Sequence, residues 1–182
     1  MPAFFLTFVA VAAAMLAGQD AIRVARLRVG LGWAGPLFIT VLLAALGGAG
    51  LAAWIAQELS PLIRPQVKPL VVSLALALAA GEVLLRSAPA KPREPTRSMG
   101  AITLVLLLGM VTDASGFIIL SLAIATGEPL LAAGGGALGA IAVLGAAIVA
   151  GDDWQALPLK PIRIAVGVAL LAAAAIIVFS AI

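Results

Sequence analysis

Apolar residues dominate six stretches of the chain, and short polar or turn-forming segments separate them. A helix of about 20 mainly apolar residues is long enough to cross the hydrocarbon core of a bilayer. The pattern therefore predicts six membrane-spanning helices, at residues 3–27, 31–57, 64–86, 99–126, 129–150 and 161–181. Glycine and proline mark the breaks between them, as at Gly35-Pro36, Ser60-Pro61 and Gly127-Glu128-Pro129.

The composition agrees with lipid as the main solvent of this chain. Hydrophobic residue types make up 64% and charged types only 10%, and the mean hydropathy is +1.23. Water-soluble domains carry far more charge, so we expect an all-α integral membrane protein whose main partner is the lipid bilayer. The first apolar stretch lacks the positive start of a signal peptide, and we expect it to remain as a helix.

The chain contains no cysteine and no histidine. This excludes disulfides, thiolate or imidazole metal ligands and histidine acid–base chemistry, and leaves the carboxylates as candidates. The sequence shows no nucleophile–base pair, haem ligand or nucleotide motif, so we expect neither an enzyme nor a cofactor. The basic residues lie between apolar stretches, so they indicate membrane topology and not nucleic-acid binding. The sequence is also compatible with a homo-oligomer.

Lysine and arginine are retained on the cytoplasmic side of bacterial membranes. With the N-terminus outside, nine basic residues are cytoplasmic, namely Arg23, Arg26, Arg28, Arg86, Lys91, Arg93, Arg97, Lys160 and Arg163. Only Arg64 and Lys68 then face out. We therefore expect a multi-pass protein with both termini extracytoplasmic, in a pattern that fits a bacterial inner membrane.

The chain divides into two related halves. The interval from Asp20 to Pro36-Leu37 equals that from Asp113 to Pro129-Leu130, and Lys68-Pro69 falls opposite Lys160-Pro161 after one single-residue gap. We predict a first three-helix repeat at residues 1–87, a basic, proline-rich cytoplasmic linker at 88–98 and a second repeat at 99–182. Three helices per half make the repeats inverted, an architecture that secondary transporters use to build midplane sites.

Asp113 is the only charged residue within the apolar stretch 99–126. An ionised carboxylate is costly there, so it should face a bundle interior, a wet cavity or a cation, or else carry a proton. Thr112 and Ser115 would add hydroxyl oxygens, which suit hard cations, and Gly116 is a point where the helix could open. The alternatives are a neutral Asp113 that bonds a neighbouring helix, and hydroxyls that bond their own helix. Glu82, near Arg86, could assist proton movement or simply be an interfacial carboxylate.

Asp20 occupies the equivalent position in the first half, preceded by Gln19 and followed at helical spacing by Arg23 and Arg26. This spacing predicts an ion pair between Asp20 and Arg23. The pair has two interpretations. It is either a simple salt bridge at the cytoplasmic end of the helix, or Arg23 is a tethered cation that fills the first-half site and leaves Asp113 as the exchangeable acid.

Glycines are dense in two of the predicted helices, and Gly135 and Gly139 form a small-xxx-small pair. Small residues at this spacing allow helices in a membrane to approach closely. The run Gly134-Gly135-Gly136 lacks the Lys-Ser/Thr of a phosphate loop, so we interpret it as a packing surface.

The layout resembles the small six-helix calcium/manganese:proton antiporter family, whose motif is E-x-G-D-K/R-T/S. The corresponding segments are Ala17-Gly18-Gln19-Asp20-Ala21-Ile22 and Met110-Val111-Thr112-Asp113-Ala114-Ser115. The two aspartates and Ser115 match the motif, whereas Ala17 and Met110 stand where the family has its glutamates. The resemblance implies transport of Mn²⁺ or Ca²⁺ in exchange for protons, with Asp20, Asp113 and Ser115 as candidate ligands.

The leading hypothesis is a secondary transporter that exchanges or exports a small cation against protons through a midplane carboxylate site. Its candidate metal-binding residues are Asp20, Asp113, Ser115, Thr112 and Gln19. The alternative is a non-transporting membrane protein, either a decayed paralogue or an accessory subunit, with structural aspartates. The two differ in one geometric respect, because transport predicts that Asp20 and Asp113 meet beside a polar cavity.

Overall fold

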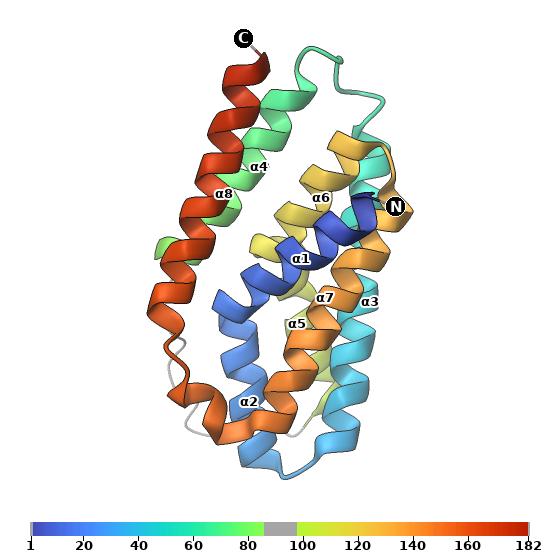
Figure 1. Ribbon diagram of the computed structural model, residues 1–182. Helices are drawn as coiled ribbons and strands as arrows, with labels where there is room; N and C mark the ends of the chain where they lie inside the picture. Colours follow the sequence, from blue (N-terminus) through green and yellow to red (C-terminus); the bar gives the residue numbers. More distant parts are fainter. Residues whose placement is uncertain (1, 86–97, 182) are drawn as a thin grey trace.

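The computed structural model describes residues 2–85 and 98–181 (Figure 1). Within these residues the chain forms helices and no strands: α1 (Pro2–Ala17), α2 (Gln19–Leu31), α3 (Ala34–Leu59), α4 (Lys68–Leu85), α5 (Met99–Thr112), α6 (Ala114–Thr126), α7 (Pro129–Ala150), the short 3-10 helix η1 (Gly151–Ala156) and α8 (Leu159–Ala181). The predicted linker at 88–98 lies outside the described residues except for Ser98, as do the basic residues Arg86, Lys91, Arg93 and Arg97.

Four helical segments are long and apolar enough to cross a membrane unaided: α3, α4, the stretch Pro129–Trp154 and α8. Two bent pairs would each add one span if a pair crosses as a unit. Helices α1 and α2 meet at 62°, and α5 and α6 meet at 50°. The described residues therefore form a multi-pass helical membrane protein with four to six candidate spans.

The first and fourth predicted helices, 3–27 and 99–126, are not continuous. The chain leaves the helical conformation at Gly18 and again at Asp113, whose ψ of 178° is extended. At the second break the first turn of α6 lies directly against the last turn of α5. A Cβ on Gly116 would clash with the carbonyl oxygen of Val111, so this close approach requires glycine. Hydropathy alone does not reveal the second break, because α5 and α6 are equally apolar.

Helices α3 and α7 pack together at the centre, and each bent pair packs against the long helix of the other half of the chain. Helix α1 crosses α7 where Gly135 and Gly139 face the backbone of α1. A Cβ on Gly139 would lie 2.7 Å from the carbonyl oxygen of Phe8, and one on Gly135 would clash with that of Phe4. The predicted packing role of these two glycines is confirmed.

The contact between α5 and α3 uses the same device. A Cβ on Gly48 of α3 would lie only 2.8 Å from the Cβ of Met110 on α5, and one on Gly47 would lie 2.9 Å from a methyl of Leu107. In both contacts, therefore, glycines of the long helix allow the bent pair of the other half to pack closely against it.

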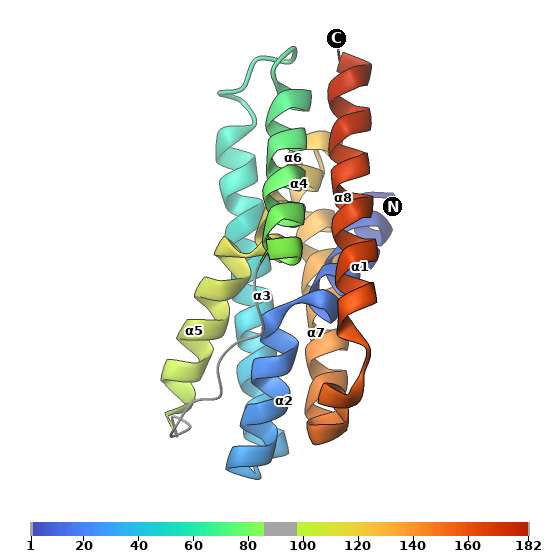
Figure 2. The ribbon, with the colours of Figure 1, turned by 90° about the vertical axis from the view of Figure 1, so that its left-hand side faces the viewer.

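Helices α4 and α8 run side by side along one flank, as both views show (Figures 1 and 2). Gly167 of α8 lies against the side chain of Leu84 on α4. In the most apolar segment of α8 only 17% is buried inside the bundle, compared with 56% in the corresponding segment of the stretch that contains α7. Helix α8 is therefore a peripheral helix held mainly by α4.

The outer surface carries large apolar side chains that a soluble protein would bury. Val149, Leu130 and Phe179 are 89%, 82% and 78% exposed, respectively. Exposed apolar surface on this scale is stable only against lipid or a partner protein. The two ends of the chain lie toward the same end of the bundle (Figure 1).

Candidate functional site

Seven polar or charged residues are buried among the described residues: Thr7, Asp20, Thr40, Ser73, Asp113, Ser115 and Ser121. Four of them donate a hydroxyl hydrogen bond to a carbonyl of their own helix, namely Thr7, Thr40, Ser73 and Ser121. The remaining three, Asp20, Asp113 and Ser115, all lie at the two helix breaks. Buried polarity that local helix bonding does not explain is thus concentrated at one place.

These three residues line one small cavity, together with Gln19, Glu82 and Arg163 and apolar residues of α1, α4 and α6. The space open to the centres of water molecules is about 30 Å³. A single water needs about 10–15 Å³ on this measure, so the cavity has room for about two waters or a small ion. Its walls come from both halves of the chain.

Asp20 and Asp113 approach each other across Gly109 of α5. A Cβ built on Gly109 would lie 3.4 Å from Oδ2 of Asp20 and 3.5 Å from Oδ2 of Asp113. The distance between the two Oδ2 atoms therefore cannot exceed the sum of these two distances. The two aspartates, one from each half of the chain, therefore lie close together beside this cavity.

The helix breaks also set the electrostatics of the two carboxylates. Asp20 lies in the first turn of α2, and Asp113 is the residue that precedes α6. The N-terminal end of a helix carries a partial positive charge, which stabilises an anion near it. The side chain of Asp113 makes no capping hydrogen bond to the backbone of α6.

The predicted ion pair between Asp20 and Arg23 is present. Nη1 of Arg23 donates to Oδ1 of Asp20 at 2.9 Å, and Nη2 donates to Oε1 of Gln19 at 3.2 Å. Asp20 is 4% exposed, whereas Arg23 reaches the cavity residues from a more exposed position. The pair thus joins a carboxylate that lines the cavity to a partly exposed guanidinium.

Of the two predicted hydroxyl ligands, the structure brings only Ser115 to the cavity. Its Oγ donates to the carbonyl oxygen of Met110 at 3.3 Å, across the break between α5 and α6. Thr112 is exposed and donates to Leu108 of its own helix at 2.9 Å. The position of Thr112 corresponds to the alternative in which a hydroxyl bonds its own helix.

Sequence reasoning missed Arg163 as a site residue and gave Glu82 only a minor role. Arg163 lies near the start of α8, and its Nε donates to the carbonyl oxygen of Val83 at 3.1 Å. Both residues line the cavity. Arg163 counted in the sequence only as a topology signal, because its proximity to Asp113 depends on how α8 packs against α4.

The described residues contain no group of three or more histidine, cysteine, aspartate and glutamate side chains arranged to hold a metal ion. Comparisons of the chain with models of protein families, with curated proteins and with solved structures find no match.

Proposed function

We propose that this protein is a secondary transporter that exchanges a small cation for protons at the cavity between the two helix breaks. The observation that carries the proposal is the approach of Asp20 and Asp113, one from each half, beside a small cavity that both line. When both carboxylates are ionised they repel each other; Arg23 offsets part of this repulsion, and a proton or a cation relieves the rest. Alternating occupation by the two is the basis of exchange.

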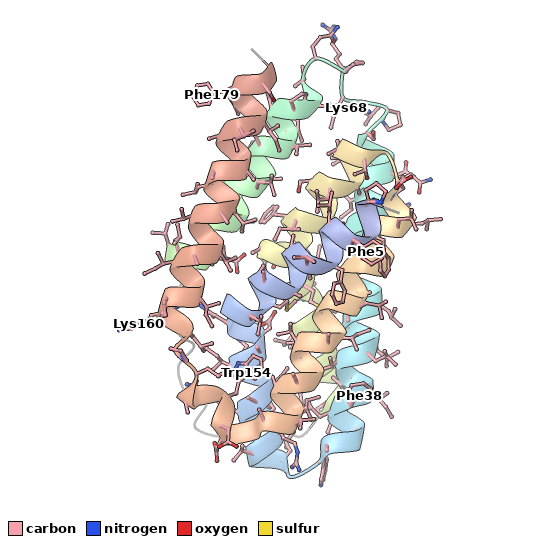
Figure 3. All side chains as sticks on the ribbon, viewed as in Figure 1. Phe5, Phe38, Lys68, Trp154, Lys160 and Phe179 are labelled. Carbon is pink, nitrogen blue, oxygen red and sulfur yellow. The ribbon has the colours of Figure 1, made fainter. Side chains whose placement is uncertain are left out.

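The arrangement of the helices supports six spans in two inverted repeats. Each half supplies a bent pair, a long central helix and a final helix, and each bent pair packs against the long helix of the other half. Lys68 and Lys160, which start the corresponding final helices, lie toward opposite ends of the bundle (Figure 3). Discontinuous helices that meet at a midplane site are typical of transporters with inverted repeats.

The donor set favours a proton and a monovalent cation over Mn²⁺ or Ca²⁺. Calcium takes six to eight oxygen ligands, and carboxylates commonly supply the charge that offsets its dehydration. Here Arg23 already pairs with Asp20, and Arg163 adds a second positive charge to the cavity wall. The cation:proton antiporter family that the motif layout resembles remains the proposed relationship, with a changed ion preference.

The orientation belongs to the same proposal. The described basic residues of α2 and the start of α8 would face the cytoplasm, and Arg64 and Lys68 the opposite side. Both termini would then be extracytoplasmic, in a multi-pass protein of a bacterial inner membrane, with lipid as the surrounding partner.

The second candidate is a non-transporting membrane protein with structural aspartates, either a decayed paralogue or an accessory subunit. The ion pair between Asp20 and Arg23 favours it, because an internal counter-ion neutralises one of the two carboxylates. In that case the cavity holds only waters, and neither aspartate exchanges a cation.

The two candidates differ in proton flux. The protein is reconstituted into liposomes that contain a pH-sensitive dye, and Na⁺, K⁺, Mn²⁺ and Ca²⁺ are added in turn. We expect cation-dependent proton movement in the wild type, its loss in Asp113→Asn, and normal flux in Asp153→Asn, which changes an exposed aspartate of η1. Folded wild-type protein that moves protons with none of these cations would refute the exchange.

A further inference from the structure

Gly109 has surroundings that differ from those of every other described glycine. The three atoms nearest to the position of its missing Cβ are all carboxylate oxygens: Oδ2 of Asp20 at 3.4 Å, Oδ2 of Asp113 at 3.5 Å and Oδ1 of Asp20 at 3.7 Å. The other described glycines face apolar side chains, backbone atoms or open space.

The usual reasons for a glycine in a helix do not apply at Gly109. The described glycines with a positive φ are Gly32, Gly127 and Gly151, so the backbone of Gly109 is one that any residue adopts. Close helix packing does not require it either, since the three distances are ordinary van der Waals contacts. Gly48 is different, because a Cβ there would come within 2.8 Å of Met110. A glycine inside a helix is less favourable than alanine, and what distinguishes Gly109 from Gly100 of the same helix is the pair of carboxylates beside it.

We infer that Gly109 is a positioning residue, whose missing side chain leaves room beside the carboxylates of Asp20 and Asp113 for a small cation or a water molecule. The inference rests on the proposed function in so far as the species that enters this space is the one exchanged. A methyl group on residue 109 would touch both carboxylates and could neither donate a hydrogen bond nor coordinate an ion. This methyl group would occupy the room beside the two carboxylates without moving the helices.

Three variants test this role. Gly109→Ala adds the methyl group, and Gly109→Ser adds a hydroxyl that can donate to either carboxylate. Gly100→Ala is the matched control, because Gly100 lies on the same helix and a Cβ there has no neighbour within 4 Å. Both alanine variants gain the same helix propensity, so only the effect on the carboxylates differs between them.

The first readouts are thermal unfolding and proton flux in liposomes. We expect Gly109→Ala to unfold at the same temperature as the wild type or higher, while its initial rate of flux falls about tenfold. Gly109→Ser should recover part of that rate, and Gly100→Ala should keep all of it. A destabilised Gly109→Ala protein would show that the glycine serves packing and would overturn the inference.

The second readout is independent of transport. Infrared spectra contain carboxyl bands, and difference spectra against Asp20→Asn and Asp113→Asn assign those of the two aspartates. These bands should shift in Gly109→Ala and stay in place in Gly100→Ala, because only the first methyl displaces the partners of the carboxylates. Unshifted bands together with normal flux in Gly109→Ala would overturn the role of Gly109. Shifted bands in a protein whose wild type shows no flux would retain that role and refute transport instead.

Discussion

The carboxylates of Asp20 and Asp113 come from different halves of the chain and lie against the same face of Gly109, with their Oδ2 atoms 3.4 and 3.5 Å from its Cβ position. Each belongs to the start of a half-helix, so the two breaks meet at this point. The charge that the two carboxylates carry therefore acts directly on the contact between the two halves of the chain. This coupling is what an exchange mechanism needs.

The ion pair between Asp20 and Arg23 gives the first prediction. Arg23→Gln should lower the free energy of unfolding by roughly 1–2 kcal/mol, because it leaves the buried carboxylate of Asp20 without its counter-ion while the arginine itself is partly solvated. Asp20→Asn combined with Arg23→Gln should cost less than the sum of the single changes. Unfolding in detergent measures this coupling, and strictly additive effects would argue against a stabilising pair.

The two hydroxyls near Asp113 give a second, matched prediction. Ser115→Ala removes a hydroxyl that lines the cavity and bonds across the helix break, so it should slow proton flux in liposomes several-fold. Thr112→Ala removes an exposed hydroxyl that bonds its own helix and should leave the flux unchanged. Equal effects of the two substitutions would contradict the assignment of Ser115 to the site.

Helix packing gives a third prediction at adjacent glycines of α7. Gly135→Ala should lower the free energy of unfolding by about 1–3 kcal/mol, because the new methyl group clashes with the backbone of α1. Gly134→Ala should cost little, since its Cβ would meet only the ring of Phe4 at 3.6 Å. Thermal unfolding of the two variants tests the crossing of α1 and α7, and similar stabilities would place it elsewhere.

The orientation gives a fourth prediction, which the absence of native cysteine makes simple to test. Leu62 is 80% exposed between α3 and α4, and Asp153 is exposed in η1 at the other end of the bundle. A membrane-impermeant maleimide should label Leu62→Cys in intact cells, and Asp153→Cys only after the cells are opened. The reverse result would invert the topology, and labelling of both in intact cells would contradict their placement at opposite ends.

The sequence identified the two central acids because charge stands out in an apolar stretch. Asp113 needed no knowledge of the fold, since no other charge occurs in residues 99–126. The ion pair of Asp20 was likewise accessible, because residues three apart share a helix face. What depended on local pattern could be predicted.

Features that depend on tertiary packing could not be predicted in this way. The break at Asp113 redirects the chain, so that Ser115 faces the cavity and Thr112 does not, although both lie within two residues of the aspartate. Arg163 reaches the cavity only because α8 packs against α4. Gly109 has no side chain that a sequence pattern could single out, and only the folded structure shows that the carboxylates of Asp20 and Asp113 lie beside it.

The peripheral position of α8 has a consequence for the synthesis of the protein. This helix supplies Arg163, so the cavity wall is incomplete until α8 enters the bilayer and packs against α4. Up to that moment the nascent chain holds Asp20, Glu82 and Asp113 beside an open flank, and exposed carboxylates are costly in lipid. Insertion of α8 would therefore be the step that covers these three carboxylates, and a chain that stops before it would leave a polar surface facing the bilayer.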